Sequence, residues 1–245
     1  AQPNPLFVCP MQRQRRNRSN VQRQQVNVRR NRNRNQNQGS ARVRQYQIVR
    51  SPSSRLGLPY NLRLTMPYVY TWANATAAPG FYDWVLRGNG LFDPDTAIGG
   101  NSAYGLNEMH TLYSTYKVLG SRCIVSVVNL DTSNPLQVAV IPTNYSAGFS
   151  AAQQDGVIVH PRSRRMMVDR YDGTKTVSNA IGTNEAMNVR DIDDVGFSAA
   201  CTADPTHQWY WHVVSWNNGG AIANCEIKLQ IEFDTVFSGV KAHTI

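Results

Sequence analysis

Apolar and polar residues alternate along several stretches of this chain. From Tyr60 to Trp72, apolar or aromatic residues fill the even positions, and polar residues fill most of the odd ones. Positions 225–233 alternate in the same way, with Cys225, Ile227 and Phe233 among the apolar set. A period of two is typical of a half-buried β-strand, because successive side chains point to opposite faces. Both stretches are therefore predicted to be long strands.

Further strands are predicted at 116–129, 136–141 and 208–216, which are rich in Val, Ile, Tyr or Trp, and with a weaker pattern at 81–87, 164–168 and 175–181. Turn residues at 131–135 and 217–220 predict short hairpin links. Helical periodicity is confined to 106–116, with Asn107 as the candidate cap. The long connections 88–106, 144–163 and 182–207 are polar and contain glycine, so we expect them outside the core. This pattern predicts an all-β protein, a single eight-stranded jelly roll of the β-sandwich class.

Charge divides the chain into two parts. Residues 1–82 contain fourteen arginines and no acidic residue, whereas residues 83–245 contain 11 basic and 16 acidic side chains. The first part therefore carries +14 and the second −5, which together give the formal +9. In residues 11–38, nine Arg and fourteen Asn or Gln fill 23 of the 28 positions. So few apolar groups cannot offset the entropy of ordering the backbone, and we expect a disordered basic N-terminal arm over residues 1–55, followed by a shell domain over 56–245.

A polycationic arm requires a polyanion, and nucleic acid is the most abundant one in cells. The arm contains arginine and no lysine, and guanidinium forks bind phosphate in bidentate fashion and stack on bases. A flexible arginine and amide mixture suits single-stranded nucleic acid better than one fixed groove. Two other interpretations of the arm stay open: the Arg15-Arg16 and Arg29-Arg30 pairs resemble nuclear import signals, and repelling charges also act as a solubilising tail. The predicted nucleic-acid-binding residues are Arg13, Arg15, Arg16, Arg18, Arg23, Arg29, Arg30, Arg32, Arg34, Arg42, Arg44, Arg50 and Arg55.

The sequence contains no pattern that predicts catalysis, a metal site or a cofactor. Five histidines and four cysteines are scattered without ligand spacing, so neither zinc nor a disulfide framework is expected, and the thiols are predicted to be reduced. No nucleophile motif or phosphate-binding glycine loop occurs. No run of 18 apolar residues exists, so no membrane span is expected, and residues 1–10 lack the pattern of a secretory signal.

Three charged groups and the tryptophans have competing interpretations. Asp93 and Asp95 flank Pro94, which is typical of a turn rather than of acid–base chemistry. A second acidic group consists of Asp191, Asp193 and Asp194. It suits a solvated loop or a salt bridge better than a Ca²⁺ site, and both interpretations stay open. Arg162, Arg164 and Arg165 form a second basic cluster that could face nucleic acid, an outside polyanion or an acidic neighbour. The five tryptophans are expected in the core or in subunit interfaces, with Trp84 the least constrained.

Two segments resemble the capsid proteins of small circular single-stranded DNA viruses, the circovirus-like group. They are LRGNGLFDPD at 86–95 and GLNEMHTLYSTYKVLGSR at 105–122; QWYWH at 208–212 and the last strand are similar to the same family. The resemblance runs from about residue 60 to 237, and the basic arm fits it. One departure is the dilution of the arm with Asn and Gln, which leaves the host and genus open.

The resemblance implies a structural capsid protein without enzymatic activity. It implies a homo-oligomer of sixty copies in a small icosahedral virion, a single-stranded DNA genome as partner, and assembly in the host nucleus. No cofactor, metal or membrane is implied, and the receptor is unknown. Two alternatives remain at this stage: a jelly-roll coat protein of a small RNA virus, and a single-stranded nucleic-acid-binding protein that does not assemble. A β-sandwich lectin or hydrolase with a basic leader is a weaker rival, because the chain offers it no site residues.

Overall fold

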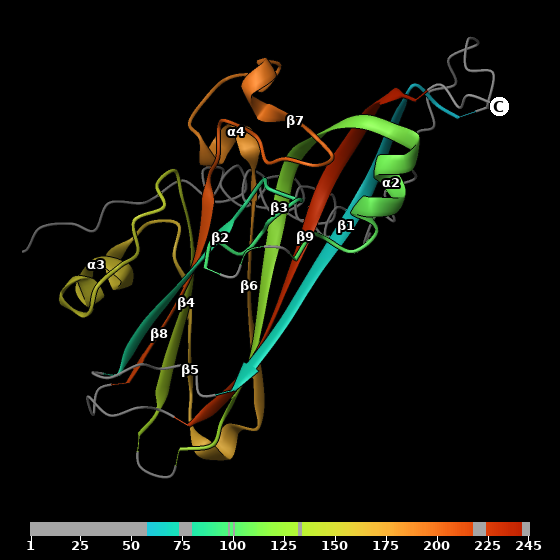
Figure 1. Ribbon diagram of the computed structural model, residues 1–245. Helices are drawn as coiled ribbons and strands as arrows, with labels where there is room; N and C mark the ends of the chain where they lie inside the picture. The colour runs from blue at the N-terminus through green and yellow to red at the C-terminus, as the bar shows by residue number, and fades with distance from the viewer. Residues whose placement is uncertain are drawn as a thin grey trace, which may run out of the picture. The chain divides into compact units, whose positions relative to one another are not determined.

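The computed structural model describes residues 58–73, 80–97, 99, 101–131, 134–217 and 224–241. All of them lie in the second of the two units into which the chain divides, residues 46–245. The boundary predicted at residues 55 and 56 lies outside the described residues. Within this unit the strands form two antiparallel sheets (Figure 1).

Sheet A and sheet B each contain four principal strands. The order in sheet A is β1 (Asn61–Ala73), β9 (Cys225–Val240), β3 (Tyr113–Asn129) and β6 (Thr174–Gly182), and the short β7 (Ser198–Ala200) also pairs with β3. The order in sheet B is β2 (Phe81–Arg87), β8 (Tyr210–Asn217), β4 (Leu136–Thr143) and β5 (Arg164–Val168). Two packed antiparallel sheets with this interleaved order form a jelly roll, an architecture shared by viral capsid proteins, lectins and cupins. The predicted fold class is confirmed.

The predicted hairpin links are wrong. β3 lies in sheet A and β4 in sheet B, so the link at 131–135 crosses between the layers. The link that begins at 217 joins β8 of sheet B to β9 of sheet A. In a jelly roll most successive strands alternate between the two sheets, and a short turn then joins strands that do not pair. Turn chemistry alone does not distinguish these two uses of a short link.

The predicted helix at 106–116 is also partly wrong. α2 spans only Leu106–Leu112, and Tyr113 already belongs to β3. The residue before the helix is Gly105 with φ 86°, so a left-handed glycine rather than Asn107 begins it. Tyr113 and Tyr116 are fully buried and pair with Val240 and Phe237 of β9. Burial of these two rings therefore outweighs the helical periodicity of the segment.

The main core lies between the two sheets. In β9, Leu229, Ile231 and Phe233 are fully buried, whereas Lys228, on the opposite parity, is exposed. In β1, Met66 and Tyr68 are buried on the even parity that the sequence predicts. The alternation read from the sequence thus orients both strands correctly toward the core.

The long connections contribute to the interior, contrary to expectation. Leu91 and Ala103 in the first connection and Phe197 in the third are buried. In the second connection, η1 (Ala151–Gln153) and α3 (Gln154–Val159) place Val157 in a second apolar cluster, with Ala139, Ile141, Val214 and Trp216 of sheet B. A few apolar residues in a polar segment are enough to anchor it, since each buried aliphatic side chain contributes about 1.5–3 kcal/mol.

Three further short elements complete the described part: η2 (Arg170–Asp172), α4 (Thr183–Ala186) and η3 (Val195–Phe197). Among the described residues, no helix has the length and apolar character that a membrane crossing requires.

Candidate functional site

The thirteen arginines predicted to bind nucleic acid, Arg13 to Arg55, lie outside the described residues. The fourteenth arginine of the basic segment belongs to the folded domain. Arg63 lies in β1 and donates to both carboxylate oxygens of Asp234 on β9, at 2.7 and 2.5 Å. Its charge is therefore neutralised within the sheet, and thirteen arginines remain for the arm.

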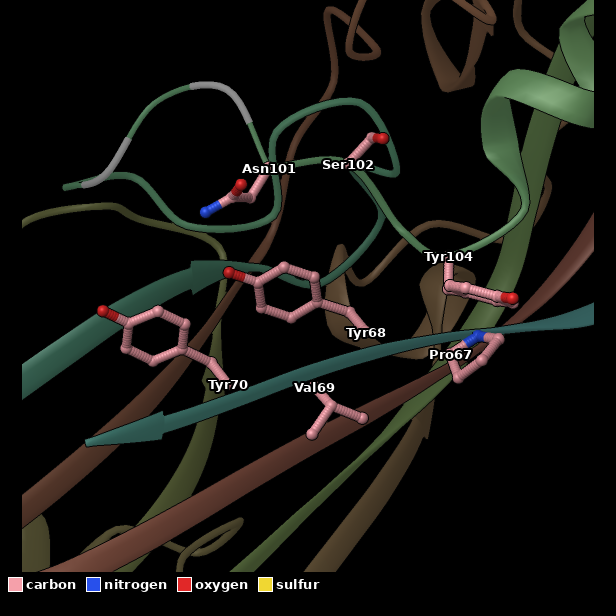
Figure 2. A pocket seen from close by; sticks show the side chains of 7 residues that line it. All are labelled: Pro67, Tyr68, Val69, Tyr70, Asn101, Ser102 and Tyr104. Atoms are coloured by element: carbon pink, nitrogen blue, oxygen red, sulfur yellow. The ribbon is translucent and has the colours of Figure 1, made fainter.

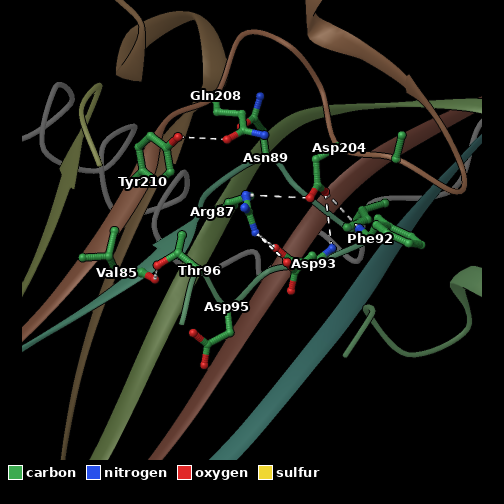
Figure 3. Close-up of polar contacts among 12 residues, drawn as sticks. Val85, Arg87, Asn89, Phe92, Asp93, Asp95, Thr96, Asp204, Gln208 and Tyr210 are labelled. Atoms are coloured by element: carbon green, nitrogen blue, oxygen red, sulfur yellow. Dashed lines mark hydrogen bonds and ion pairs between the residues drawn. The ribbon is translucent and has the colours of Figure 1, made fainter. Parts of the chain in front are cut away.

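The segment around Asp93 and Asp95 is held by a polar network at one end of β2 (Figure 3). Arg87 forms ion pairs with Asp93 at 3.1 Å and with Asp204 at 3.7 Å. The Asp204 carboxylate also accepts the backbone N–H groups of Phe92 and Asp93, at 3.2 and 3.4 Å. Burial raises the pKa of the Asp204 carboxyl, and the positive charge of Arg87 opposes that rise. The network ties the 88–95 loop to the segment before β8.

Backbone contacts in the same loop support the turn interpretation of the Asp-Pro-Asp sequence. The N–H of Ala97 donates to Oδ1 of Asp95 at 2.8 Å, which is a local Asx turn. The side chain of Asn89 donates to the carbonyl of His207 at 2.8 Å and accepts from the N–H of Trp209 at 3.2 Å. The residues that carry the family resemblance at 86–95 therefore shape the fold.

The carboxylates at 191, 193 and 194 serve the structure of their own loop. Asp191 accepts the N–H of Asp193 at 3.1 Å, and Asp194 accepts that of Gly196 at 2.8 Å. Asp193 also lies 3.5 Å from the ammonium of Lys117. Among the described residues, no group of three or more acidic, histidine or cysteine side chains is placed to hold a metal ion.

The second basic cluster lies at the edge of sheet B. Arg164 and Arg165 begin β5, pair in register with Val140 and Ala139 of β4, and are both exposed. Arg162 lies just before the strand, and its carbonyl accepts from the side chain of Asn179 at 2.8 Å. Asn179 belongs to β6, so the start of the cluster is bonded to sheet A while Arg164 and Arg165 pair within sheet B.

A buried histidine and aspartate form a polar pair that the sequence does not reveal. Nδ1 of His212 lies 2.8 Å from the carboxylate of Asp83, and the two side chains are 0% and 4% exposed. The same carboxylate accepts the N–H of Phe149 at 2.6 Å, and Nε2 of His212 lies 3.1 Å from the carbonyl of Tyr145. Both ring nitrogens of His212 therefore face oxygen atoms that accept hydrogen bonds. The pair connects β2 and β8 to the connection that carries α3, and 129 residues separate its members.

An open groove of about 440 Å³ lies along the edge strand β1 (Figure 2). Tyr68 and Tyr70 line it from the strand, and Tyr104 lines it from the loop that crosses the edge. The N–H of Tyr104 donates to the carbonyl of Pro67 at 2.8 Å, which covers part of the strand edge. Burial is the main cause that raises the pKa of Tyr68 to about 12. The groove has aromatic walls and no cluster of reactive groups.

The interpretation of the tryptophans as core residues is supported. Trp209, Trp211 and Trp216 are buried, and Trp72 and Trp84 pack on each other with ring centroids 3.7 Å apart. Cys123, Cys201 and Cys225 are buried, and Cys9 lies outside the described residues.

Comparisons with known proteins find likeness in structure alone. No family model and no curated protein matches the chain. Among solved structures, a chain of Desmodium yellow mottle tymovirus has a TM-score of 0.40 at 10% identity, covering 74% of this chain and 91% of that one. A chain of turnip yellow mosaic virus has a TM-score of 0.41 at 8% identity, covering 76% and 98%. A chain of cucumber necrosis virus has 0.41 at 14%, covering 76% and 58%. Similarity at this level says nothing about function, and the jelly roll is established by the strand order of this chain.

Proposed function

We propose that this chain is a structural viral capsid protein that assembles as sixty copies into a small icosahedral shell and packages single-stranded DNA through its arginine-rich arm. The observation that carries the proposal is the combination of an arginine-rich segment and a jelly roll in one chain. A segment with thirteen arginines and no acidic residue precedes the first strand of an eight-stranded jelly roll. The architecture is one that viral capsid proteins share, and the arm supplies a polycation for a packaged genome.

Charge arithmetic supports the proposal. Sixty arms with thirteen arginines each neutralise about 780 phosphates at one charge per phosphate. That is a substantial part of a small single-stranded genome, and mobile cations supply the remainder. The resemblance of 86–95 and 105–122 to circovirus-like capsid proteins favours DNA over RNA. The paired arginines in the arm also suit import into the host nucleus, where the resemblance places assembly.

Exposed apolar side chains in the connections between strands are available for subunit contacts. Tyr104 is 83% exposed, Val195 84% and Val159 76%. Large apolar groups at the surface, surrounded by polar ones, are typical of protein–protein interfaces. We assign these connections to contacts between copies.

The test is expression of the whole chain, followed by negative-stain electron microscopy, the absorbance ratio at 260 and 280 nm, and nuclease digestion. We expect uniform round particles with nuclease-protected nucleic acid, and enzymatic typing then distinguishes DNA from RNA. A chain lacking residues 1–55 is expected to keep the fold and lose packaging. A monodisperse species near 27 kDa that binds oligonucleotides and never forms particles under varied salt would instead indicate a binding protein that does not assemble.

A further inference from the structure

Four arginines between positions 162 and 170 have no acidic partner among the described residues. Elsewhere in the described chain, Arg63, Arg87 and Lys117 form ion pairs with carboxylates. The four arginines form none with any described carboxylate, although they lie within nine positions of one another. Like charges repel, so such clustering is a cost to the isolated domain unless a polyanion compensates it. The four are Arg162, Arg164, Arg165 and Arg170.

The acidic residues nearest in sequence are already engaged. Asp172 accepts the ammonium of Lys175 at 2.6 Å and the N–H of Asp169 at 2.7 Å, and the Lys175 bond lowers the pKa of the Asp172 carboxyl. Asp169 accepts the N–H of Arg170 at 2.7 Å. These carboxylates build the η2 turn, so the arginine side chains stay available.

The arginines lie along an open edge. β5 pairs with β4 on one side and is the last strand of sheet B, and η2 follows it before β6 (Figure 1). The backbone from Arg164 to Val168 extends about 13 Å. Lys175 donates to the edge carbonyl of Met167 at 3.1 Å, a contact that blocks addition of another strand at that point. The side chains of Arg164 and Arg165 at the start of the strand are exposed to an extended ligand.

An exposed aromatic ring lies beside the last of these arginines, Arg170. Tyr171 is 89% exposed, and the guanidinium of Arg170 lies 5.8 Å from its ring centroid. An exposed tyrosine next to guanidinium groups is the combination that binds single-stranded nucleic acid, in which bases stack on the ring and phosphates bind the arginines. A sulfated glycan or an acidic protein loop offers anions but no base to stack.

We propose that this edge is a second nucleic-acid contact, which binds a short single-stranded segment with phosphates on Arg164 and Arg165 and a base on Tyr171. We call it the β5 strip, made of Arg162, Arg164, Arg165, Arg170 and Tyr171. The proposal rests on the proposed packaging function and deepens it. The arm supplies most of the charge, and the β5 strip fixes a segment of nucleic acid at a defined place on each subunit.

The first test is crosslinking on the full chain. The chain is mixed with a short oligodeoxythymidine carrying 5-iododeoxyuridine, irradiated, and digested for mass spectrometry. We expect a crosslinked peptide that contains Tyr171, in addition to peptides from the arm. Crosslinks confined to the arm would overturn the proposal.

The second test measures affinity and its salt dependence with the same oligonucleotide. Y171A is expected to weaken binding about tenfold, and Y171F to keep it, because the phenyl ring stacks equally well. R164A/R165A is expected to lower the slope of log affinity against log salt by about 1.4, at about 0.7 per phosphate contact on a single strand. The matched control R190A/K228A removes two exposed cations elsewhere and is expected to leave the slope unchanged. Thermal unfolding checks that each variant is folded.

Other functions of the strip give different results. If R164A/R165A prevents shell formation while oligonucleotide affinity and slope stay unchanged, the strip is a contact between copies and the proposal is wrong. If it abolishes only the binding of heparin to intact particles, the strip faces an outside polyanion and the proposal is again wrong. Failure of the capsid proposal can be distinguished from failure of this one, because crosslinking and affinity are measured on the chain whether or not it assembles.

Discussion

Asp83 and His212 form a polar pair in the apolar layer between sheet B and the connection that carries α3. Phe149 and Tyr145 contribute a backbone donor and a backbone acceptor to it, so every contact of the pair is internal. Neither sequence spacing nor charge counting indicates that the first carboxylate of the chain meets a histidine 129 positions later. Such pairs become visible only when the strand register is known, because β2 and β8 bring them together.

Removal of one partner of this pair is expected to destabilise the domain strongly. Asp83→Ala leaves the imidazole ring of His212 and the N–H of Phe149 without their acceptor in a buried place, and each unsatisfied group costs about 1–3 kcal/mol. Urea denaturation at neutral pH measures the loss. Asp155→Ala, at an exposed position of α3, is the control and should change the unfolding free energy by less than about 0.5 kcal/mol. Equal effects of the two substitutions would contradict the importance of the pair.

A second histidine is expected to make the domain sensitive to acid. The pKa of His160 is lowered, chiefly by burial and also by the positive charges of Arg162 and His212. The unfolded chain therefore binds a proton at a higher pH than the folded one, so stability falls as pH drops below the ordinary value of 6.5. In His160→Gln this contribution is absent, and the loss of stability between pH 7.5 and 5.5 should be smaller. Parallel urea titrations at the two pH values check this, and an unchanged difference would show that other groups govern the response.

At the scale of the elements, the sequence predicts where a strand lies better than it predicts which strands pair with it. The predicted bounds of β2 and β5 agree with the structure, because alternation is a local property of the chain. The helix at 106–116 was predicted too long because Tyr113 and Tyr116 enter the core through β3, a tertiary effect. The hairpin links were wrong for a similar reason: a short turn specifies a change of direction, not the sheet that the next strand joins.

Close approach of β3 and β6 depends on a glycine at the irregular point of β3. The register between β3 and β9 shifts between Val118 and Gly120, and a Cβ at Gly120 would lie 2.7 Å from the carbonyl oxygen of Ile181. Gly120→Ala is therefore expected to destabilise the domain by about 1–3 kcal/mol, because backbone cannot move aside easily. Gly156→Ala is the matched control: a Cβ there meets nothing within 4 Å, and α3 should gain about 0.5–1 kcal/mol. Thermal or urea unfolding of both variants measures the contrast, and equal shifts would contradict it.

At the scale of the whole molecule, residues 1–82 carry a formal charge of +14 and residues 83–245 carry −5. Composition predicts the arginine-rich arm, and the alternation of apolar and polar residues predicts the jelly-roll domain, because both are local properties of the sequence. The thirteen arm arginines lie outside the described residues, so their role stays a prediction. The exposure of Tyr171 beside Arg170 could not be predicted, because Tyr171 belongs to a turn whose exposure depends on how β5 and β6 are joined.

The concentration of arginine in residues 1–55 leads to a quantitative expectation for nucleic-acid binding. If each of the thirteen arm arginines contacts one phosphate, deletion of residues 1–55 lowers the slope of log affinity against log salt by about nine, at about 0.7 per contact on a single strand. Replacing the thirteen arginines by lysine keeps the charge, so the slope should stay while affinity falls, because ammonium groups lack the bidentate fork. Fluorescence anisotropy of a labelled oligodeoxythymidine over a range of salt concentrations measures both. A slope that survives the deletion would mean that the folded domain, and not the arm, carries most of the phosphate contacts.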